Sequence, residues 1–288
     1  MKNSAINTNN SLPIIVLLCS SVIWGCTWWP LKQFAAQGIS SIALITVAYG
    51  ISGLSLLPLL ILQFAQWKKE WRQVLLIFLL GGYANLAFAI SMIYGEVVRC
   101  MALFYTIPIW GVLGGRLFLG EKIDIQRAIA VALAIIGAFF ILGGMKIFAT
   151  PPSWVDLLAI SSGFAFSMNN LCFRSAQIAP VKSKVSMMFL GCASFAGLLC
   201  LAGIQPFPAI ELKSWILPII FGFVILAATL ATQWGVTHLE VGRASVIIVM
   251  ELITAVITAS LFAGENMAPV EWFGGAMILS AALLEAWR

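Results

Sequence analysis

Long runs without a charged side chain dominate this sequence. Residues 3–31, 33–67 and 73–95 are three of them. A helix that crosses a bilayer needs about 20 mostly apolar residues, so each run can hold one such helix. Charged residues make up 9% of the chain, whereas a typical soluble domain has roughly 25%. We therefore predict an all-α integral membrane protein, and we do not interpret its net charge of +5 as a sign of nucleic-acid binding.

The runs divide into ten predicted transmembrane helices joined by short connections. These helices cover residues 13–31, 41–64, 73–95, 97–119, 125–144, 155–175, 185–203, 214–236, 242–265 and 270–287. The connection around residues 150–153 is among the longest and lies at the centre of the chain. It therefore separates two predicted repeats of five helices each, residues 12–148 and 149–288, which follow a short tail, residues 1–11.

The basic residues predict which side of the membrane each connection faces. Twelve Lys and Arg residues fall on one side of the predicted membrane, and four, Lys32, Arg99, Lys146 and Lys213, fall on the other. Lys and Arg accumulate in the cytoplasmic connections of membrane proteins. We therefore predict that both termini, including the tail of residues 1–11, are cytoplasmic.

The two predicted repeats share a sequence plan. A shift of 144 positions (243 minus 99) places Arg243 on Arg99 and Glu265 on Glu121. Because five is an odd number of helices, the second repeat must cross the membrane in the opposite direction to the first. Inverted repeats are common in transporters, whose substrate site lies near the middle of the membrane between the repeats. Glu121 and Glu265, which end corresponding helices, are expected to bind backbone or loop groups.

One carboxylate, Glu251, lies in the middle of the predicted helix of residues 242–265. An ionisable side chain at this depth is costly and indicates a functional site. Removal from water favours the neutral form of a carboxyl, which suits Glu251 to exchange a proton for a substrate. It could instead balance the charge of a cationic substrate, or serve as a hydrogen-bonded structural acid between helices. The corresponding position in the first repeat is Ile107.

Aromatic and amide side chains supply further candidates for substrate binding. Trp24 and Trp28 lie on one helix face and suit stacking or cation–π contact with a planar or cationic substrate, but they equally suit core packing. Buried amides need hydrogen-bond partners, which either a substrate or a neighbouring helix can supply. The polar candidates within predicted helices are Asn85, Tyr105, Asn169, Asn170 and Gln233.

Pro108 and Gly111 are candidates for a hinge beside the predicted site. Pro108 removes a backbone hydrogen bond and should kink its helix, and Gly111 begins a Gly-x-x-x-Gly spacing that also suits close helix packing. Arg99 and Arg243 lie at helix mouths on opposite sides of the predicted membrane. They are candidate gates that pair in one state and open in the other, or they anchor helices at the interface.

Two motifs resemble the drug/metabolite transporter superfamily, specifically its EamA-type ten-helix members. The first is Val22-Ile23-Trp24-Gly25 followed by Lys32. The second is the segment Arg99–Leu119, with a proline in mid-span, followed by Gly120-Glu121-Lys122. A second-half copy ends in Gly264-Glu265. The resemblance covers nearly the whole chain and implies transport of a small molecule, commonly export.

This sequence departs from the family pattern in its second half. Residues 164–170 stand where a second Trp-Gly is expected, and Leu252 stands where a mate for Pro108 is expected. A Glu-Pro pair is frequent in that part of the family, whereas this chain has Glu251-Leu252. These departures leave the substrate open.

Other functional classes lack support in the sequence. The six cysteines lie in apolar runs without CxxC spacing, which predicts neither a metal site nor a disulfide framework. We found no phosphate loop and no nucleophile–base arrangement, so we predict neither an enzyme nor a cofactor. The first N-terminal run is interpreted as a helix and not as a signal peptide, because Trp24, Trp28 and Trp29 lie where small cleavage-site residues belong.

The leading prediction is therefore a secondary active transporter in the bacterial inner membrane. It would export an amino acid or related amine by alternating access, with proton coupling, as a monomer or a homodimer in the lipid bilayer. One alternative is efflux of hydrophobic cationic drugs. Another, of a different class, is a membrane enzyme or scaffold that transports nothing.

Overall fold

The computed structural model describes residues 11–95, 97–148, 151–204, 207–209, 211–263 and 268–287. Within these ranges the chain is a helical bundle without strands. Its α-helices are α1 (Leu12–Gly25), α2 (Trp28–Ala36), α3 (Ser41–Leu44), α4 (Gly50–Ser55), α5 (Leu57–Leu62), α6 (Phe64–Trp67), α7 (Trp71–Leu76), α8 (Gly82–Tyr94), α9 (Val97–Phe104), α10 (Ile107–Leu119), α11 (Ile125–Ile141), α12 (Trp154–Ser175), α13 (Val181–Leu201), α14 (Ile216–His238), α15 (Val241–Ile248), α16 (Met250–Ala263) and α17 (Pro269–Ala286).

Shorter helical elements of other types connect or interrupt these helices. The π-helices are η1 (Ile45–Tyr49) and η3 (Ile77–Gly81), and the 3₁₀ helices are η2 (Lys68–Glu70), η4 (Gly144–Phe148) and η5 (Leu212–Trp215). Both π-helices lie inside longer helical runs, one between α3 and α4 and the other between α7 and α8. Single-turn π segments of this kind are frequent at functional sites.

Six helical runs of the described residues are long and apolar enough to cross a membrane. They are Leu12–Ala36, Phe64–Tyr94, Arg99–Leu119, Val181–Leu201, Leu212–His238 and Val241–Phe262. The run Ser41–Ser55 and helix α11 are apolar but shorter. Helices also occupy the described parts of all ten predicted spans, but ten membrane crossings and a cytoplasmic position for both termini stay predictions.

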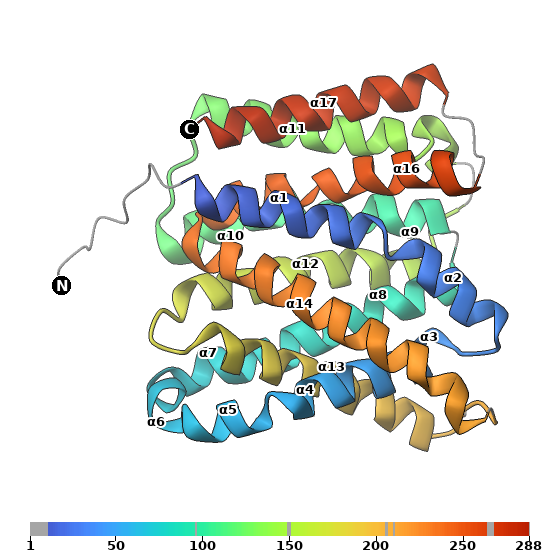
Figure 1. Ribbon diagram of the computed structural model, residues 1–288. Helices are drawn as coiled ribbons and strands as arrows, with labels where there is room; N and C mark the ends of the chain where they lie inside the picture. Colours follow the sequence, from blue (N-terminus) through green and yellow to red (C-terminus); the bar gives the residue numbers. More distant parts are fainter. Residues whose placement is uncertain are drawn as a thin grey trace.

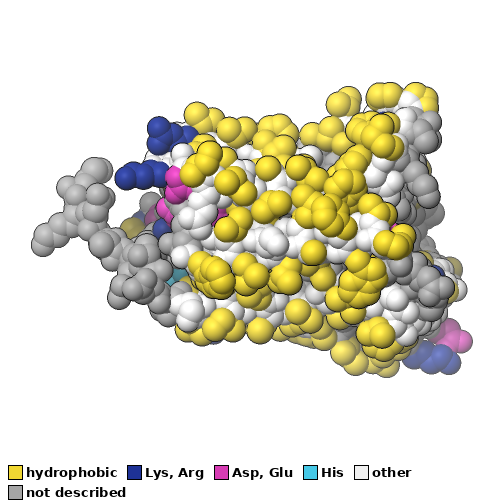
Figure 2. Space-filling model, turned by 90° about the horizontal axis from the view of Figure 1, so that it is seen from above, with side chains coloured by type: hydrophobic (Ala, Val, Ile, Leu, Met, Phe, Trp, Pro, Cys, Tyr) yellow, Lys and Arg dark blue, Asp and Glu magenta, His cyan; other side chains and the backbone are white. Residues whose placement is uncertain are grey.

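The helices run side by side along one axis of the bundle (Figure 1). Helix α1 begins and α17 ends at the same end, which we call the near end; the opposite end is the far end. Helix α1 packs against α14 and α16, and α11 packs along α17. Figure 2 shows hydrophobic side chains across the middle of one face and charged side chains towards its two ends. Such a surface suits contact with lipid along the middle of the bundle.

The predicted helices 97–119 and 242–265 are each broken in the middle. The first is interrupted at Tyr105 and Thr106, where Pro108 at the second position of α10 cannot donate a backbone hydrogen bond. The second is interrupted at Val249 although no proline is near. The same shift of 144 positions (249 minus 105) places Val249 on Tyr105. The two predicted repeats therefore have breaks at corresponding residues.

Gly25 sets the close approach of α1 to α16. A Cβ atom at this position would lie 2.6 Å from the Glu251 carbonyl oxygen and 2.6 Å from the Thr254 Cβ. Any larger residue would therefore push the two helices apart. The Trp-Gly pair at 24 and 25 thus has a structural reason: Gly25 brings α1 against the helix that carries Glu251.

The structure corrects the predicted start of one helix and shows that two basic side chains are buried. Helix α13 starts at Val181 directly after Pro180, four residues before the predicted start at 185. Lys184 is buried in it and donates hydrogen bonds of 2.8 Å to the carbonyls of Phe173 and Ala176 at the end of α12. Arg127 is buried as well. Burial of Lys184 is tolerated because its ammonium group donates to helix-terminal carbonyls that would otherwise have no partner.

Candidate functional site

Glu251 and Tyr105 form the central contact of the candidate site. Tyr105 lies in the break between α9 and α10, and Glu251 lies in the first turn of α16, just beyond the break at Val249. The Tyr105 hydroxyl donates a hydrogen bond to Glu251 Oε1. Tyr105 is buried and Glu251 is half-buried. Two residues that the sequence proposes separately, one from each predicted repeat, are therefore in direct contact.

A group of phenylalanine rings continues from Tyr105. The Phe104 ring centroid lies 5.4 Å from that of Tyr105, 5.8 Å from that of Phe166 and 4.4 Å from that of Phe88. These rings come from α8, α9 and α12 and are partly buried. The sequence did not single them out as binding residues, because a Phe in an apolar run is equally typical of core packing. Together they place aromatic surface next to one carboxylate.

Trp24 and Trp28 hydrogen-bond to two different helices. The Trp24 indole N–H donates to the Thr232 hydroxyl on α14 at 3.2 Å, and that of Trp28 donates to the Thr258 hydroxyl on α16 at 2.9 Å. Helix α1 ends at Gly25, so the two rings belong to separate helical segments, α1 and α2. Both indoles are partly exposed, with their polar atoms satisfied. Their role in substrate binding stays a prediction.

The amides of α12 and α14 form a buried cluster. Asn170 Oδ1 accepts hydrogen bonds from Gln233 Nε2 at 3.1 Å and from Asn169 Nδ2 at 3.4 Å. All three side chains are at most 1% exposed. The remaining polar atoms, Asn169 Oδ1, Asn170 Nδ2 and Gln233 Oε1, have no protein partner in the described part of the chain. The cluster therefore joins two helices and keeps unused hydrogen-bonding capacity.

Asn85 belongs to a different polar contact. Its Nδ2 donates to the Gly81 carbonyl at 2.9 Å, and its Oδ1 accepts from the Tyr49 hydroxyl at 3.5 Å. Tyr49 and Gly81 are the last residues of the two π-helices η1 and η3. The side chain therefore bridges the two irregular segments.

Gly111, one of the two predicted hinge residues, lies at a packing contact between the two predicted repeats. A Cβ atom at Gly111 would lie 2.7 Å from the Ser245 Cβ, so α10 and α15 approach closely there. Pro108 is buried near the break before α10. Close packing, the alternative interpretation for Gly111, is therefore present; a hinge motion stays a prediction.

The predicted gate residues make contacts at opposite ends of the bundle. Arg99 Nε and Nη2 donate to the two Asp156 oxygens at 2.7 and 2.8 Å, in a geometry that favours strong ion pairing. Arg243 is buried and its Nη2 donates to the Ala286 carbonyl at 2.7 Å. Glu265, the second-repeat mate of Glu121, lies outside the described residues. The gate roles stay predictions.

Sequence reasoning missed a near-end ion network centred on Arg127. This side chain pairs with Glu240, with Glu285 at 3.3 Å and with Glu121 at 3.6 Å, and its Nη1 donates to the Lys122 carbonyl at 3.2 Å. Arg127 is one of the twelve basic residues on the predicted cytoplasmic side. Its position inside the predicted helix 125–144 was the one sign that it is not simply a surface residue.

Glu121 binds backbone groups, as predicted. Its two carboxylate oxygens accept hydrogen bonds from the backbone N–H groups of Val241 at 2.7 Å and Gly242 at 3.2 Å. These N–H groups belong to the first turn of α15 and lack partners within the helix. Burial raises the pKa of Glu121, whereas the two backbone hydrogen bonds and Arg127 oppose that shift.

Comparisons with known proteins point to one family. The model of the EamA-like transporter family matches residues 11–143 and again residues 153–286. An uncharacterized transporter from Archaeoglobus fulgidus is 24% identical over 199 residues, which cover 67% of this chain and 68% of that protein. A solved crystal structure superposes with a TM-score of 0.78 over 96% of this chain and 99% of the other, at 15% identity. The superposition concerns the fold alone.

Proposed function

This chain belongs to the EamA-like transporter family, and from this premise we propose that it is a secondary active transporter that exports an amino acid or related amine. It is an integral, multi-pass membrane protein whose family and relative are transporters. Family membership therefore argues against the alternative of a membrane enzyme or scaffold. The substrate class, the direction and the coupling to protons are parts of the proposal.

The contact between Glu251 and Tyr105 is the observation that carries the proposal. A half-buried carboxylate beside aromatic rings suits an ammonium group, which binds through charge and through cation–π contact. Within the described part of the chain, the second oxygen of Glu251 accepts no side-chain hydrogen bond that a substrate would have to displace. The hydrogen bond between Tyr105 and Glu251 joins the two predicted repeats. A substrate or proton that replaces Tyr105 on Glu251 would therefore act on both predicted repeats. A proton and the ammonium group of the substrate would then compete for one carboxylate.

We further propose ten membrane crossings arranged as two inverted repeats, with both termini in the cytoplasm of a bacterial cell. Two separate matches to one family model support two repeats. The corresponding breaks at Tyr105 and Val249 support a common plan. Helices broken near the middle of the membrane commonly form the substrate site of inverted-repeat transporters.

Counterflow in proteoliposomes tests this function. The probes are the proteinogenic amino acids, their decarboxylated amines and lipophilic cations, each with and without a pH gradient. We expect an amino acid or amine to exchange, and a pH gradient to drive its net movement. The variant Glu251→Gln should lose the response to the gradient, while Glu211→Gln, at an exposed glutamate of the far end, should keep it. Wild-type coupling in Glu251→Gln would refute the role of Glu251.

Efflux of hydrophobic cations is the second candidate function. The phenylalanine rings around Tyr105 favour it, because they offer apolar surface to the body of such a molecule. The same counterflow panel separates the candidates: this function predicts exchange of lipophilic cations and none of amino acids.

A further inference from the structure

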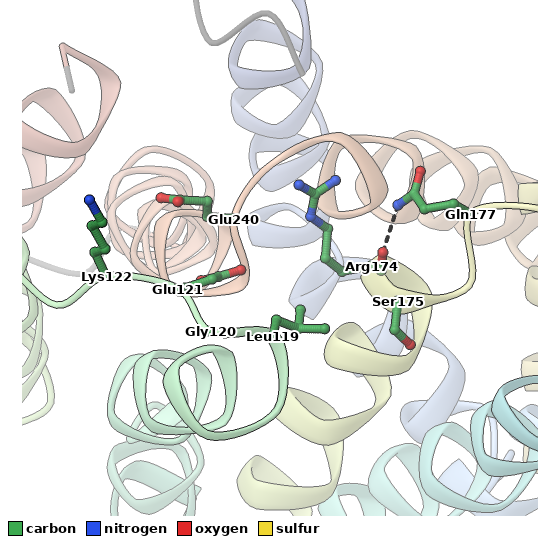
Figure 3. Close-up of a pocket in the computed structure, with 8 residues that line it drawn as sticks. All are labelled: Leu119, Gly120, Glu121, Lys122, Arg174, Ser175, Gln177 and Glu240. Atoms are coloured by element: carbon green, nitrogen blue, oxygen red, sulfur yellow. Dashed lines mark hydrogen bonds between the residues drawn. The ribbon is translucent and has the colours of Figure 1, made fainter. Parts of the chain in front are cut away.

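A cavity of about 550 Å³ opens at the near end, away from Glu251. It lies between the loop after α10, the end of α12 and the start of α15 (Figure 3). Its polar lining residues are Glu121, Lys122, Arg174, Ser175, Gln177 and Glu240. Acidic and basic side chains are thus present in equal number, two of each. This balance disfavours a ligand that carries only one sign of charge.

Glu121 and Arg174 stand on different sides of this cavity. Figure 3 shows Glu121 on the loop after α10 and the guanidinium of Arg174 directed into the space from α12. No ion pair joins Arg174 to Glu121 or Glu240 within the part of the chain that the structure describes. Opposite charges attract, so flexible side chains that line one cavity would be expected to meet unless something holds them.

Both side chains are held in place by backbone groups. Arg174 Nη1 donates to the Thr237 carbonyl at 2.8 Å, and Gln177 Nε2 donates to the same carbonyl at 3.1 Å. Glu121 accepts from the backbone N–H groups that start α15. Glu121 also pairs with Arg127 at 3.6 Å, but Arg127 shares its one positive charge with Glu240 and Glu285. The cavity therefore presents a fixed acidic and a fixed basic group that form no ion pair with each other. Binding groups fixed in advance lose little entropy when a ligand binds.

We propose that this near-end cavity binds the zwitterionic head group of an amino acid, with the ammonium on Glu121 and the carboxylate on Arg174. An amine alone would face Arg174, and a carboxylic acid alone would face Glu121; each would carry an unfavourable charge contact. A zwitterion places a charge of opposite sign next to Glu121 and next to Arg174. The assignment rests on the proposed function and adds a second site, which holds the substrate at the near end before it reaches Glu251.

Equilibrium binding to the purified full chain tests the assignment. The variant Glu251→Gln removes the central carboxylate. Ligand binding to this variant therefore reports the near-end site. The probes are the proteinogenic amino acids and, for leucine, its analogues 3-methylbutylamine and 4-methylpentanoate. We expect Glu251→Gln to keep one amino-acid site and to bind both single-charge analogues more weakly than leucine.

Substitution of Arg174 in the Glu251→Gln background gives the decisive comparison. Arg174→Gln should weaken amino-acid binding by roughly 10- to 100-fold, the equivalent of one charged hydrogen-bonded contact. It should leave the binding of 3-methylbutylamine unchanged or stronger. Arg174→Lys, which keeps the charge, should retain most of the affinity and shows that the site tolerates substitution. Arg116→Gln, at an exposed arginine of α10, is the matched control.

The outcomes separate this proposal from the proposed function. If no proteinogenic amino acid binds Glu251→Gln, or if Arg174→Gln and Arg116→Gln bind equally well, the near-end site is refuted. Equal loss of the amine and the amino acid in Arg174→Gln would also overturn it, because the carboxylate would then not be what Arg174 recognises. Failure of the proposed function is detected in the counterflow experiment, as amino-acid transport that is insensitive to Glu251→Gln.

Discussion

Replacing Arg127 with methionine should destabilise the protein far more than the same substitution at the exposed Arg116. Arg127 is fully buried and faces three carboxylates, Glu121, Glu240 and Glu285. Methionine replaces the aliphatic part of the arginine side chain but has no charge and no hydrogen-bond donor. The variant Arg127→Met therefore leaves three acids close together without the cation that they share.

The burial of each carboxylate sets the size of the effect. The Glu285 side chain is 0% exposed and that of Glu121 is 7% exposed, whereas that of Glu240 is 40% exposed. The exposed partner contributes little because solvent screens it. Removal of one partner from a buried ion pair costs about 3–5 kcal/mol. At roughly 2–4 °C per kcal/mol for large chains, the unfolding midpoint should fall by about 10 °C.

Thermal unfolding in detergent, followed by intrinsic tryptophan fluorescence or by loss of the monodisperse peak, measures this shift. Arg116→Met is the matched control and should remain within about 1 °C of wild type, because Arg116 is exposed. The double variant Arg127→Met/Glu285→Met should recover much of the loss, since apolar pairs often replace buried ion pairs well. A single variant as stable as the control, or a double variant less stable than the single, would refute this reasoning.

Three further predictions follow from other contacts. Burial raises the pKa of Glu121 above its ordinary value of 4.5. Wild type should therefore lose stability relative to Glu121→Gln as the pH rises from 4.5 through the raised pKa. Unfolding midpoints of both proteins across this range check the sign, and a wild-type midpoint that rises relative to that of the variant contradicts it. Gly25→Val should cost about 1–3 kcal/mol through overpacking against α16, and an unchanged midpoint would show that the two helices are not in close contact. Tyr105→Phe should change substrate exchange by roughly 10-fold or more through loss of a hydrogen bond to a carboxylate, at an unfolding midpoint near that of wild type; exchange at the wild-type rate would place Glu251 outside the transport path.

Several features of this protein follow from the sequence without a structure. Apolar runs without charge are a local property, and they predicted the membrane class and the approximate helices. The break near Pro108 was also predicted, because proline lacks a backbone N–H and so removes a hydrogen bond within its own helix. Glu251 was recognisable because a carboxylate inside an apolar run is costly in any fold. The backbone contact of Glu121 was predicted from its place after a helix end.

Tertiary packing decided which of these residues meet. Tyr105 and Glu251 are 146 positions apart, and Arg127 and Glu285 are 158 apart. Contacts at such separations depend on how helices cross, which apolar periodicity does not encode when every face of a helix is apolar. For the same reason the sequence assigned Arg127 and Lys184 only to a side of the membrane and did not predict their burial. Only the packed helices supply the carboxylates and carbonyls that make a buried cation stable.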